Sequence, residues 1–241
     1  MTISPARRAA YEVLLRVFEH DAFADRALAT AAAGLEERDR ALAMRLAYGA
    51  VQRVRTIDHA IETLGGRRVA KLDPPVRAAL RLGAYQLGWL EGVARYAAVN
   101  ESVELVRRAR LERAVPFTNA VLRRVADGIG PLLESLPDGP LKESYPDWIW
   151  DVWRRDLGEE ETVALAIAQN EPPPVVVRHV RGQTPDGSET DVPNAWEVAR
   201  VDEKALQKGE IWPQSKASQL AALAAFIAVT LTLVMLLYEL E

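Results

Sequence analysis

The stretch LDPPVRAALRLGAYQL, Leu72 to Leu87, determines what kind of fold the chain can form. It predicts a helix that begins at Pro74 and Pro75, where a missing N–H costs little, with Asp73 as its N-cap. Apolar residues recur near helical spacing, and small residues between them allow another helix to approach closely. The apolar set is Val76, Leu80, Tyr85 and Leu87, and the small set is Ala79, Gly83 and Ala84.

Two more helical segments follow this stretch. Residues 100–113 combine an apolar face with four arginines, and VPFTNAVLRR, residues 115–124, restarts a helix at Pro116. We expect this last helix to stop at Asp127-Gly128, because glycine favours the end of a helix. Three helices joined by short breaks, each with an apolar and a basic face, predict an α-helical domain that carries positive charge.

Three runs in this order resemble the NusB fold. They are the stretch at 72–87, AVNESVEL at 98–105 and FTNAVLRR at 117–124. Over residues 4–220 the chain more closely resembles the NusB-type N-terminal domain and following region of the RsmB family of bacterial rRNA 5-methylcytosine methyltransferases. The resemblance implies a mainly α protein, with a NusB-like all-helical bundle, a small, incomplete α/β subdomain and an apolar C-terminal helix.

The resemblance ends before the catalytic domain of that family. Its members continue into a glycine-rich S-adenosylmethionine loop and use two cysteines, one of which attacks carbon 6 of the cytosine. This chain has no cysteine, and residues 221–238 carry no charge. We therefore expect no catalytic residue and no bound cofactor, although the family uses S-adenosylmethionine. A metal site is not expected either, because His20, His59 and His179 lack metal-ligand spacing.

Composition and charge bound the remaining possibilities. Hydrophobic residues make up 49% of the 241, enough for a sizeable core, and the lack of cysteine excludes disulfides. The net charge of −4 hides an asymmetry: residues 1–128 carry 21 Lys and Arg against 15 Asp and Glu, whereas residues 129–241 carry 9 against 19. A basic first half suits a phosphate-bearing partner, or is simply a solvated surface.

Arginine pairs are the candidate RNA-binding residues. Ser4-Pro5 begins the first helix, and we expect Arg7 and Arg8 on an exposed basic face of it. The NusB family has an arginine-rich, RNA-contacting helix start at this position. Two cations at a helix N-terminus oppose the macrodipole, which favours a functional role. The other candidates lie on a basic loop or extend the same surface, and they are Arg67, Arg68, Arg107, Arg108, Arg123 and Arg124.

The rest of the chain divides by composition. Residues 22–33 and 36–64 predict helices, the second with a break or tightening at Gly49. The proline- and glycine-rich segment 129–143 predicts a linker. The predicted parts are a NusB-like RNA-binding domain at 1–128, this linker, bridging helices with a small α/β subdomain at 144–220, and an apolar tail at 221–241.

After the linker the sequence has a group of three tryptophans and two strand-like segments. Trp148, Trp150 and Trp153 either stack on bases or pack an interdomain core. Residues 175–180 and 195–200 predict strands of the small subdomain.

The apolar tail has two readings. Leu220–Tyr238 is 19 residues without a charge, and such a helix nearly spans a hydrocarbon core of about 30 Å. Its flanks argue against a membrane anchor, because Lys216 is the only nearby cation and Glu239 and Glu241 follow. We interpret the tail as a truncated or non-native end of a cytoplasmic protein, with a membrane anchor as the alternative.

Three functions follow from these observations. The first is the RNA-binding targeting region of a 16S rRNA (cytosine-5) methyltransferase, truncated before the cofactor domain and inactive alone, with small-subunit rRNA as its partner. The second is a NusB-like transcription antitermination factor that binds RNA with a protein partner. The third is a membrane-anchored helical protein. The family-like extension after the linker favours the first.

Overall fold

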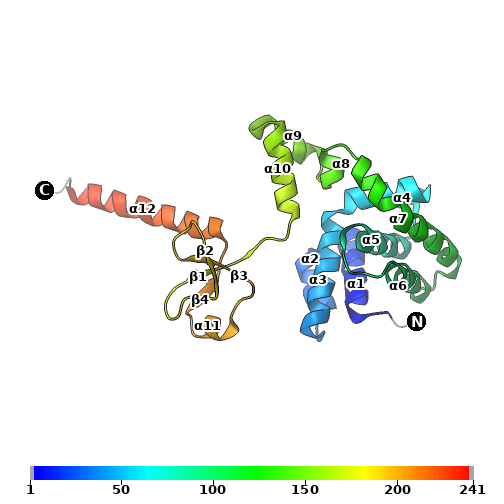
Figure 1. Cartoon of the computed structure of the whole chain (residues 1–241), viewed down its shortest axis with the longest axis horizontal. Coiled ribbons are helices and arrows are strands. Elements are labelled where there is room, and N and C mark those ends of the chain that lie inside the picture. The colour runs from blue at the N-terminus through cyan, green and yellow to red at the C-terminus, as the bar shows by residue number, and fades with distance from the viewer. Residues whose placement is uncertain (1–2, 239–241) are drawn as a thin grey trace. The chain divides into compact units, whose positions relative to one another are not determined.

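The computed structural model describes residues 3–238, without the side chains of residues 233–238. The chain forms two compact units, one that ends at Asn170 and one that begins at Glu171, and each is described by itself (Figure 1). In the described part of the first unit the regular elements are all helices, and the second unit contains a small sheet. The predicted mainly α fold, with a small strand-containing part and an apolar C-terminal helix, is confirmed.

The first unit is built from helices joined by short loops and two single 3₁₀ turns. In chain order the elements are α1 (Pro5–His20), α2 (Ala24–Ala31), α3 (Glu37–Gln52), α4 (Val54–Gly65), η1 (Val69–Lys71), α5 (Pro74–Trp89), α6 (Arg95–Arg108), η2 (Glu112–Ala114), α7 (Val115–Ser135), α8 (Pro140–Glu143), α9 (Asp147–Leu157) and α10 (Glu159–Asn170).

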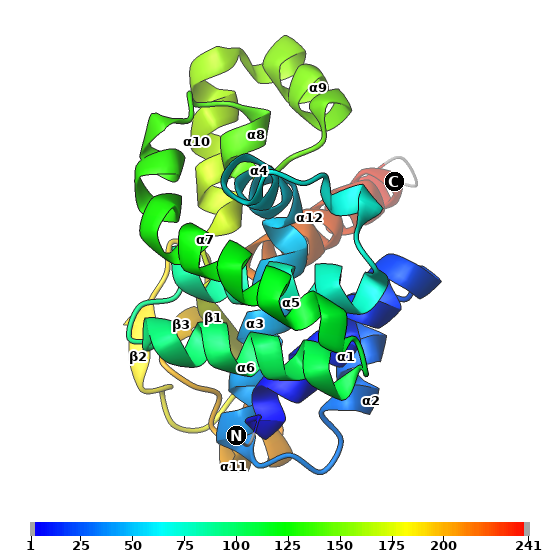
Figure 2. The same cartoon turned by 90° about the vertical axis from the view of Figure 1, so that its right-hand side faces the viewer.

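Helix α5 is the central element of this unit. It contacts α1, α3, α4, α6 and α7, which surround it (Figure 2). Ten of its sixteen residues are buried. The small residues allow this packing, since a Cβ on Gly83 would lie 2.7 Å from a methyl group of Leu122 in α7. The prediction that residues 72–87 form a helix closely approached by others is therefore confirmed.

One charged side chain is buried together with α5. Arg81, 8% exposed, donates hydrogen bonds to both carboxylate oxygens of Asp58 on α4, at 2.8 and 2.7 Å. Its guanidinium carbon also lies 4.2 Å from the centroid of the Phe18 ring on α1. A bidentate pair of this kind fixes distance and orientation together. Arg81 thus joins α1, α4 and α5.

The single helix predicted over residues 36–64 is instead two helices, α3 and α4, with a break at Arg53. The Oγ of Ser144 accepts hydrogen bonds from the backbone N–H groups of Arg55 and Thr56, at 3.0 and 3.5 Å. A distant side chain therefore caps the new helix start, which would otherwise leave these donors without partners. Gly49, the predicted position of the break, lies inside α3, and a Cβ there would collide with the Tyr85 ring.

Helix α7 continues past the predicted stop at Asp127-Gly128 and ends at Ser135. Gly128 serves close packing rather than termination, because a Cβ there would lie 2.8 Å from a methyl group of Leu64. The segment 129–143, predicted as a linker, holds the end of α7 and the short α8, which packs on α4. The compact unit extends to Asn170.

The three tryptophans of α9 have different surroundings. Trp150 is buried at 3% exposure, and Trp153 packs edge-on against Tyr145 with ring centroids 4.9 Å apart. Trp148 is 69% exposed. Packing therefore accounts for Trp150 and Trp153 but not for Trp148.

The second unit is a small antiparallel sheet with two helices. The strands predicted at 175–180 and 195–200 are β1 (Val175–His179) and β3 (Ala195–Val198), which pair with Val177 opposite Trp196. Two further strands are only three residues long, too short for a periodic sequence signal. The sheet order is β2-β3-β1-β4, and the elements are β1 (Val175–His179), β2 (Gly187–Glu189), β3 (Ala195–Val198), α11 (Glu203–Gln207), β4 (Ile211–Pro213) and α12 (Lys216–Tyr238).

Helix α12 is the predicted apolar C-terminal helix. Several of its apolar side chains are exposed, among them Phe226 and Val229 at 69% each. In the part of the chain that the structure describes, no helix has the length and apolar character needed to cross a membrane. The rest of the predicted tail, with the side chains of residues 233–238 and the flanking Glu239 and Glu241, lies outside the described residues.

A buried tyrosine on α1 should lower the free energy of unfolding at alkaline pH. Burial raises the pKa of Tyr11 from its usual value near 10 to about 12, and its hydroxyl has no partner among the described residues. The pKa of Tyr11 is higher in the folded state than in the unfolded state, so ionisation of this tyrosine favours unfolding. Its effect on the free energy of unfolding is absent below pH 10, and the free energy of unfolding then falls as the pH rises to about 12. Tyr11→Phe should remove that loss. At neutral pH it should be neutral or stabilising by about 1 kcal/mol.

The measurement is urea unfolding at neutral pH and at rising alkaline pH. The exposed Tyr96, 69% accessible, provides the control Tyr96→Phe, which should keep the wild-type pH dependence. An unchanged alkaline loss of stability in Tyr11→Phe would contradict the prediction.

Candidate nucleic-acid interface

The loop after α4 presents two of the predicted arginines. Helix α4 ends at Gly65, and the φ of 71° at the following Gly66 lies in the left-handed region that favours glycine. Arg67 and Arg68 follow and are exposed. Val69 is buried, and its backbone N–H donates to the Oε1 of Glu62 at 2.8 Å. This anchor holds the loop, so the arginines are displayed from a fixed backbone.

The connection between α6 and α7 supplies the facing residues. Helix α6 ends at Arg108, and Arg110 adopts a left-handed φ of 62° that turns the chain. The turn η2 then leads directly into α7. Arg113 and Phe117, four residues apart, lie at this junction, and both line a pocket that opens between it and the α4–α5 loop.

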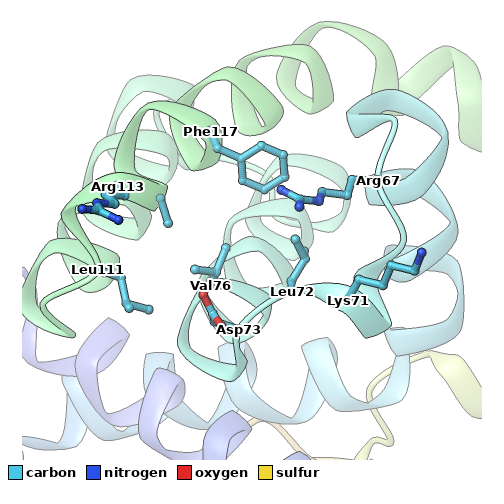
Figure 3. A pocket seen from close by; sticks show the side chains of 9 residues that line it. Arg67, Lys71, Leu72, Asp73, Val76, Leu111, Arg113 and Phe117 are labelled. Atoms are coloured by element: carbon cyan, nitrogen blue, oxygen red, sulfur yellow. The ribbon is translucent and has the colours of Figure 1, made fainter.

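This pocket has a volume of about 470 Å³. The guanidinium carbon of Arg67 lies 5.6 Å from the centroid of the Phe117 ring, within cation–π range. Figure 3 shows Phe117 and Arg67 on one side and Asp73 on the opposite side. We call it the basic pocket, and its lining is Arg67, Lys71, Leu72, Asp73, Val76, Leu111, Arg113, Ala114 and Phe117.

The charged side chains that line the basic pocket do not stabilise the described fold through ion pairs. In the described chain, Arg67, Lys71, Arg113 and Asp73 take part in no ion pair. Asp73 occupies the predicted N-cap position of α5, but its side chain accepts no capping hydrogen bond there. Three cations beside an apolar, aromatic surface suit a ligand that carries both phosphate and a flat ring.

Other predicted arginines surround this pocket or lie elsewhere on the same helices. Arg124 of α7 donates from Nη2 to the carbonyl oxygen of Gly65 at 3.2 Å, which brings it to the loop that carries Arg67 and Arg68. Arg107 is paired with Glu104 and lies 3.8 Å from Glu112, measured from Nε to Oε2. Arg108 and Arg123 are exposed, on α6 and α7.

Arg7 does not lie on an exposed face, and that expectation is wrong. Its side chain is 12% exposed and points into the bundle. Nη1 lies 3.0 Å from Glu101 Oε1, and Nε donates to Gln86 Oε1 at 2.5 Å. Glu101 also accepts from the backbone N–H of Ser4 at 2.8 Å. The carboxylate explains why an arginine is tolerated at this helix start. Arg8 is exposed, as predicted.

The two groups of predicted arginines do not form one surface through Arg7. Arg7 meets α5 at Gln86, whereas the basic pocket meets α5 at Asp73 and Val76. Val76 and Gln86 are ten positions apart on α5, a distance of about 15 Å along the axis. RNA contact by the predicted residues therefore stays a prediction, and Arg7 has a structural role that the sequence did not show.

The sequence did not single out Phe117, Asp73 or Arg113 as site residues. Phe117 belongs to one of the family motifs, and Asp73 is predicted only as a helix cap. The members of the pocket come from two segments, 67–76 and 111–117, whose nearest ends are 35 residues apart in the chain, and no local spacing links them. The sequence held one weak indication that the Asp73 side chain is available to a ligand. Asp73 precedes two prolines, so the first two helical positions offer it no N–H to cap.

A profile of the NusB family matches residues 4–127, more than half of the chain. The chain belongs to the NusB family. The match ends close to the predicted boundary at residue 128, while the compact unit that contains it continues to Asn170.

Relatives of two kinds resemble this NusB-family chain. Ribosomal RNA small subunit methyltransferase B of Thermus thermophilus is 40% identical over 188 residues, which are 77% of this chain and 42% of the relative. Transcription antitermination protein NusB of Halorhodospira halophila is 38% identical over 93 residues, which are 39% of this chain and 60% of the relative. The chain spans about two fifths of the length of the curated methyltransferases it matches.

One solved structure resembles most of the chain. The crystal structure of PH0851 covers 93% of this chain and 56% of its own, with a TM-score of 0.58 and 18% sequence identity. At that identity the likeness concerns the fold alone. It extends beyond the NusB-family match, as does the alignment with the Thermus methyltransferase.

The two neighbouring arginines of α1 should respond differently to substitution in this NusB-family domain. Arg7→Ala leaves the part-buried Glu101 without its cation and should lower the free energy of unfolding by about 3 kcal/mol. Arg8→Ala removes an exposed side chain and should change it by less than about 0.5 kcal/mol. Urea unfolding of the full chain measures both. Equal effects would contradict the assignment of Arg7 to the fold.

Proposed function

We propose that this chain is the RNA-binding, targeting region of an RsmB-type 16S rRNA (cytosine-5) methyltransferase. The observation that carries the proposal is the basic pocket, whose cations have no acidic partner in the described structure and one of which, Arg67, lies beside the Phe117 ring. Arginine forks pair with phosphate oxygens, and bases stack on aromatic rings or on guanidinium planes. Arg67 and Arg113 would hold the RNA backbone, and Arg68 and Arg124 would extend the contact along the α4–α5 loop.

The length of the similarity supports a methyltransferase region over a free antitermination factor. The alignment with the Thermus methyltransferase covers 188 residues, against 93 for the Halorhodospira antitermination protein. Bridging helices and a small sheet after the NusB-family domain fit the first class. The second candidate, an antitermination factor that binds RNA with a protein partner, rests on the 38% identity to that NusB protein. Either role places the chain in the cytoplasm.

The residues of this chain do not fit the methyl-transfer step. Attack on carbon 6 of cytosine requires a thiolate, and the sequence has no cysteine. From Lys216 to Tyr238 the chain is the single helix α12, and residues 217–238 include no carboxylate for the ribose of S-adenosylmethionine. We therefore assign RNA binding and orientation to this chain and derive no catalytic step from it.

The salt dependence of RNA binding tests the proposed phosphate contacts. Arg67→Gln with Arg113→Gln should weaken binding to single-stranded fragments of small-subunit rRNA. It should also reduce the slope of log K against log salt concentration by about 0.7 for each phosphate that the double variant no longer neutralises. Fluorescence anisotropy at several salt concentrations measures both quantities.

The matched control removes the same charge within the first compact unit. Lys142→Gln with Arg154→Gln changes two cations, one on α8 and one on α9. Helix α8 docks at the start of α4, whereas the basic pocket lies next to the end of α4. This pair should leave affinity and slope unchanged. An equal decrease in affinity in both double variants would remove the basic pocket from the interface.

Cellular RNA captured with the chain distinguishes the two candidate functions. Crosslinking followed by sequencing should enrich small-subunit rRNA for an RsmB-type targeting region. Enrichment of leader transcripts instead would favour the antitermination factor.

A further inference from the structure

We infer that the basic pocket is a base-specific subsite that accepts one unstacked guanine of the RNA. The inference rests on the proposed RNA-binding function and adds which base the pocket selects. It is carried by the position of Asp73, which lies across the basic pocket from Phe117 and Arg67 (Figure 3), and by the size of the pocket.

The pocket has the size and the walls that a base requires. Its volume of about 470 Å³ lies within the range of small-molecule sites, roughly 300–1,000 Å³. Leu72, Val76 and Leu111 supply apolar walls. The guanidinium carbon of Arg67 lies 5.6 Å from the centroid of the Phe117 ring, and the Arg67 side chain is exposed, so an incoming base can reach both groups. Stacking of a base on a guanidinium plane is a common mode of single-strand RNA recognition.

A carboxylate in a phosphate-binding surface needs an explanation, because it repels phosphate. Asp73 is exposed, forms no ion pair among the described residues and does not cap α5. Pro74 and Pro75 leave no N–H at the first two helical positions, and Asp73 does not accept from the remaining capping donor, the N–H of Val76. Both carboxylate oxygens are therefore available as acceptors. A ligand that offers donors at this point, rather than phosphate, accounts for the residue.

Guanine is the base whose hydrogen-bonding edge fits a carboxylate. Its Watson–Crick edge carries N1–H and the 2-amino group side by side, so both carboxylate oxygens can each accept a hydrogen bond. Adenine and cytosine offer one donor group next to an acceptor, and uracil offers one N–H between two acceptors. Stacked on Arg67, the guanine would direct this edge across the pocket to Asp73, while Arg113 and Lys71 contact the adjacent phosphates.

The test uses the full chain and labelled octameric oligouridine with one central substitution. The guanosine-containing RNA should bind about tenfold more tightly than the adenosine-containing one. Inosine, which lacks the 2-amino group, should lose part of this preference. Asp73→Asn should abolish the preference for guanosine, while binding of unsubstituted oligouridine should stay equal or increase because a negative charge is removed.

Two controls separate recognition from charge and from folding. Glu112→Gln removes the same charge from η2, next to the pocket segment, and should keep the guanosine preference. The thermal unfolding midpoint of Asp73→Asn should match that of the wild type, since the carboxylate forms no capping hydrogen bond in the described structure.

The outcomes distinguish this inference from the proposed function. RNA binding without a preference for guanosine, or a preference that survives Asp73→Asn, overturns the guanine subsite and leaves RNA binding intact. Absence of RNA binding at low salt overturns both. Displacement of the guanosine-containing RNA by an equal concentration of GMP also overturns the assignment, because the pocket would then be a site for a free nucleotide.

Discussion

The bundle depends on the neutralisation of one buried arginine. Helix α5 can be surrounded by five others only if Arg81 keeps its hydrogen bonds inside the protein, and an unpaired buried charge would cost several kcal/mol. Asp58 meets this requirement from α4, and Phe18 covers the guanidinium from α1. Because α4 and α5 are held together in this way, the loop that joins them and the start of α5 are placed to line one side of the basic pocket.

Arginine has two distinct uses in this domain. Arg7 and Arg81 are enclosed by carboxylates and amides, and they connect helices. Arg67 and Arg113 have no acidic partner in the described chain, and they lie where short turns expose them. Some arginines of the basic first half of the sequence therefore hold helices together inside the domain, and others are available to a ligand. Net charge alone overstates how much of it is available to a nucleic acid.

The sequence predicted features that depend on neighbours along the chain. The helix at Pro74, the first helix at Pro5 and two of the strands follow from capping and periodicity, and the family resemblance followed from three runs in order. It could not show the break at Arg53, because the cap comes from Ser144, 89 residues away from Arg55. For the same reason it misplaced Arg7, whose partner Glu101 lies 94 residues further on. The pocket was missed because its two segments meet only in the folded chain.

The docking of α8 has a consequence for where this protein can be divided. Ser144 satisfies the first N–H groups of α4, and Arg53 pairs with Glu143 at 3.1 Å. Asn170 then donates to the carbonyl and carboxylate oxygens of Glu143, at 3.0 and 2.9 Å. A fragment cut at the end of the family match would lose all of these bonds and leave the first N–H groups of α4 without the Ser144 cap. We therefore expect a stable fragment to include the segment up to Asn170, which bridges the α3–α4 corner.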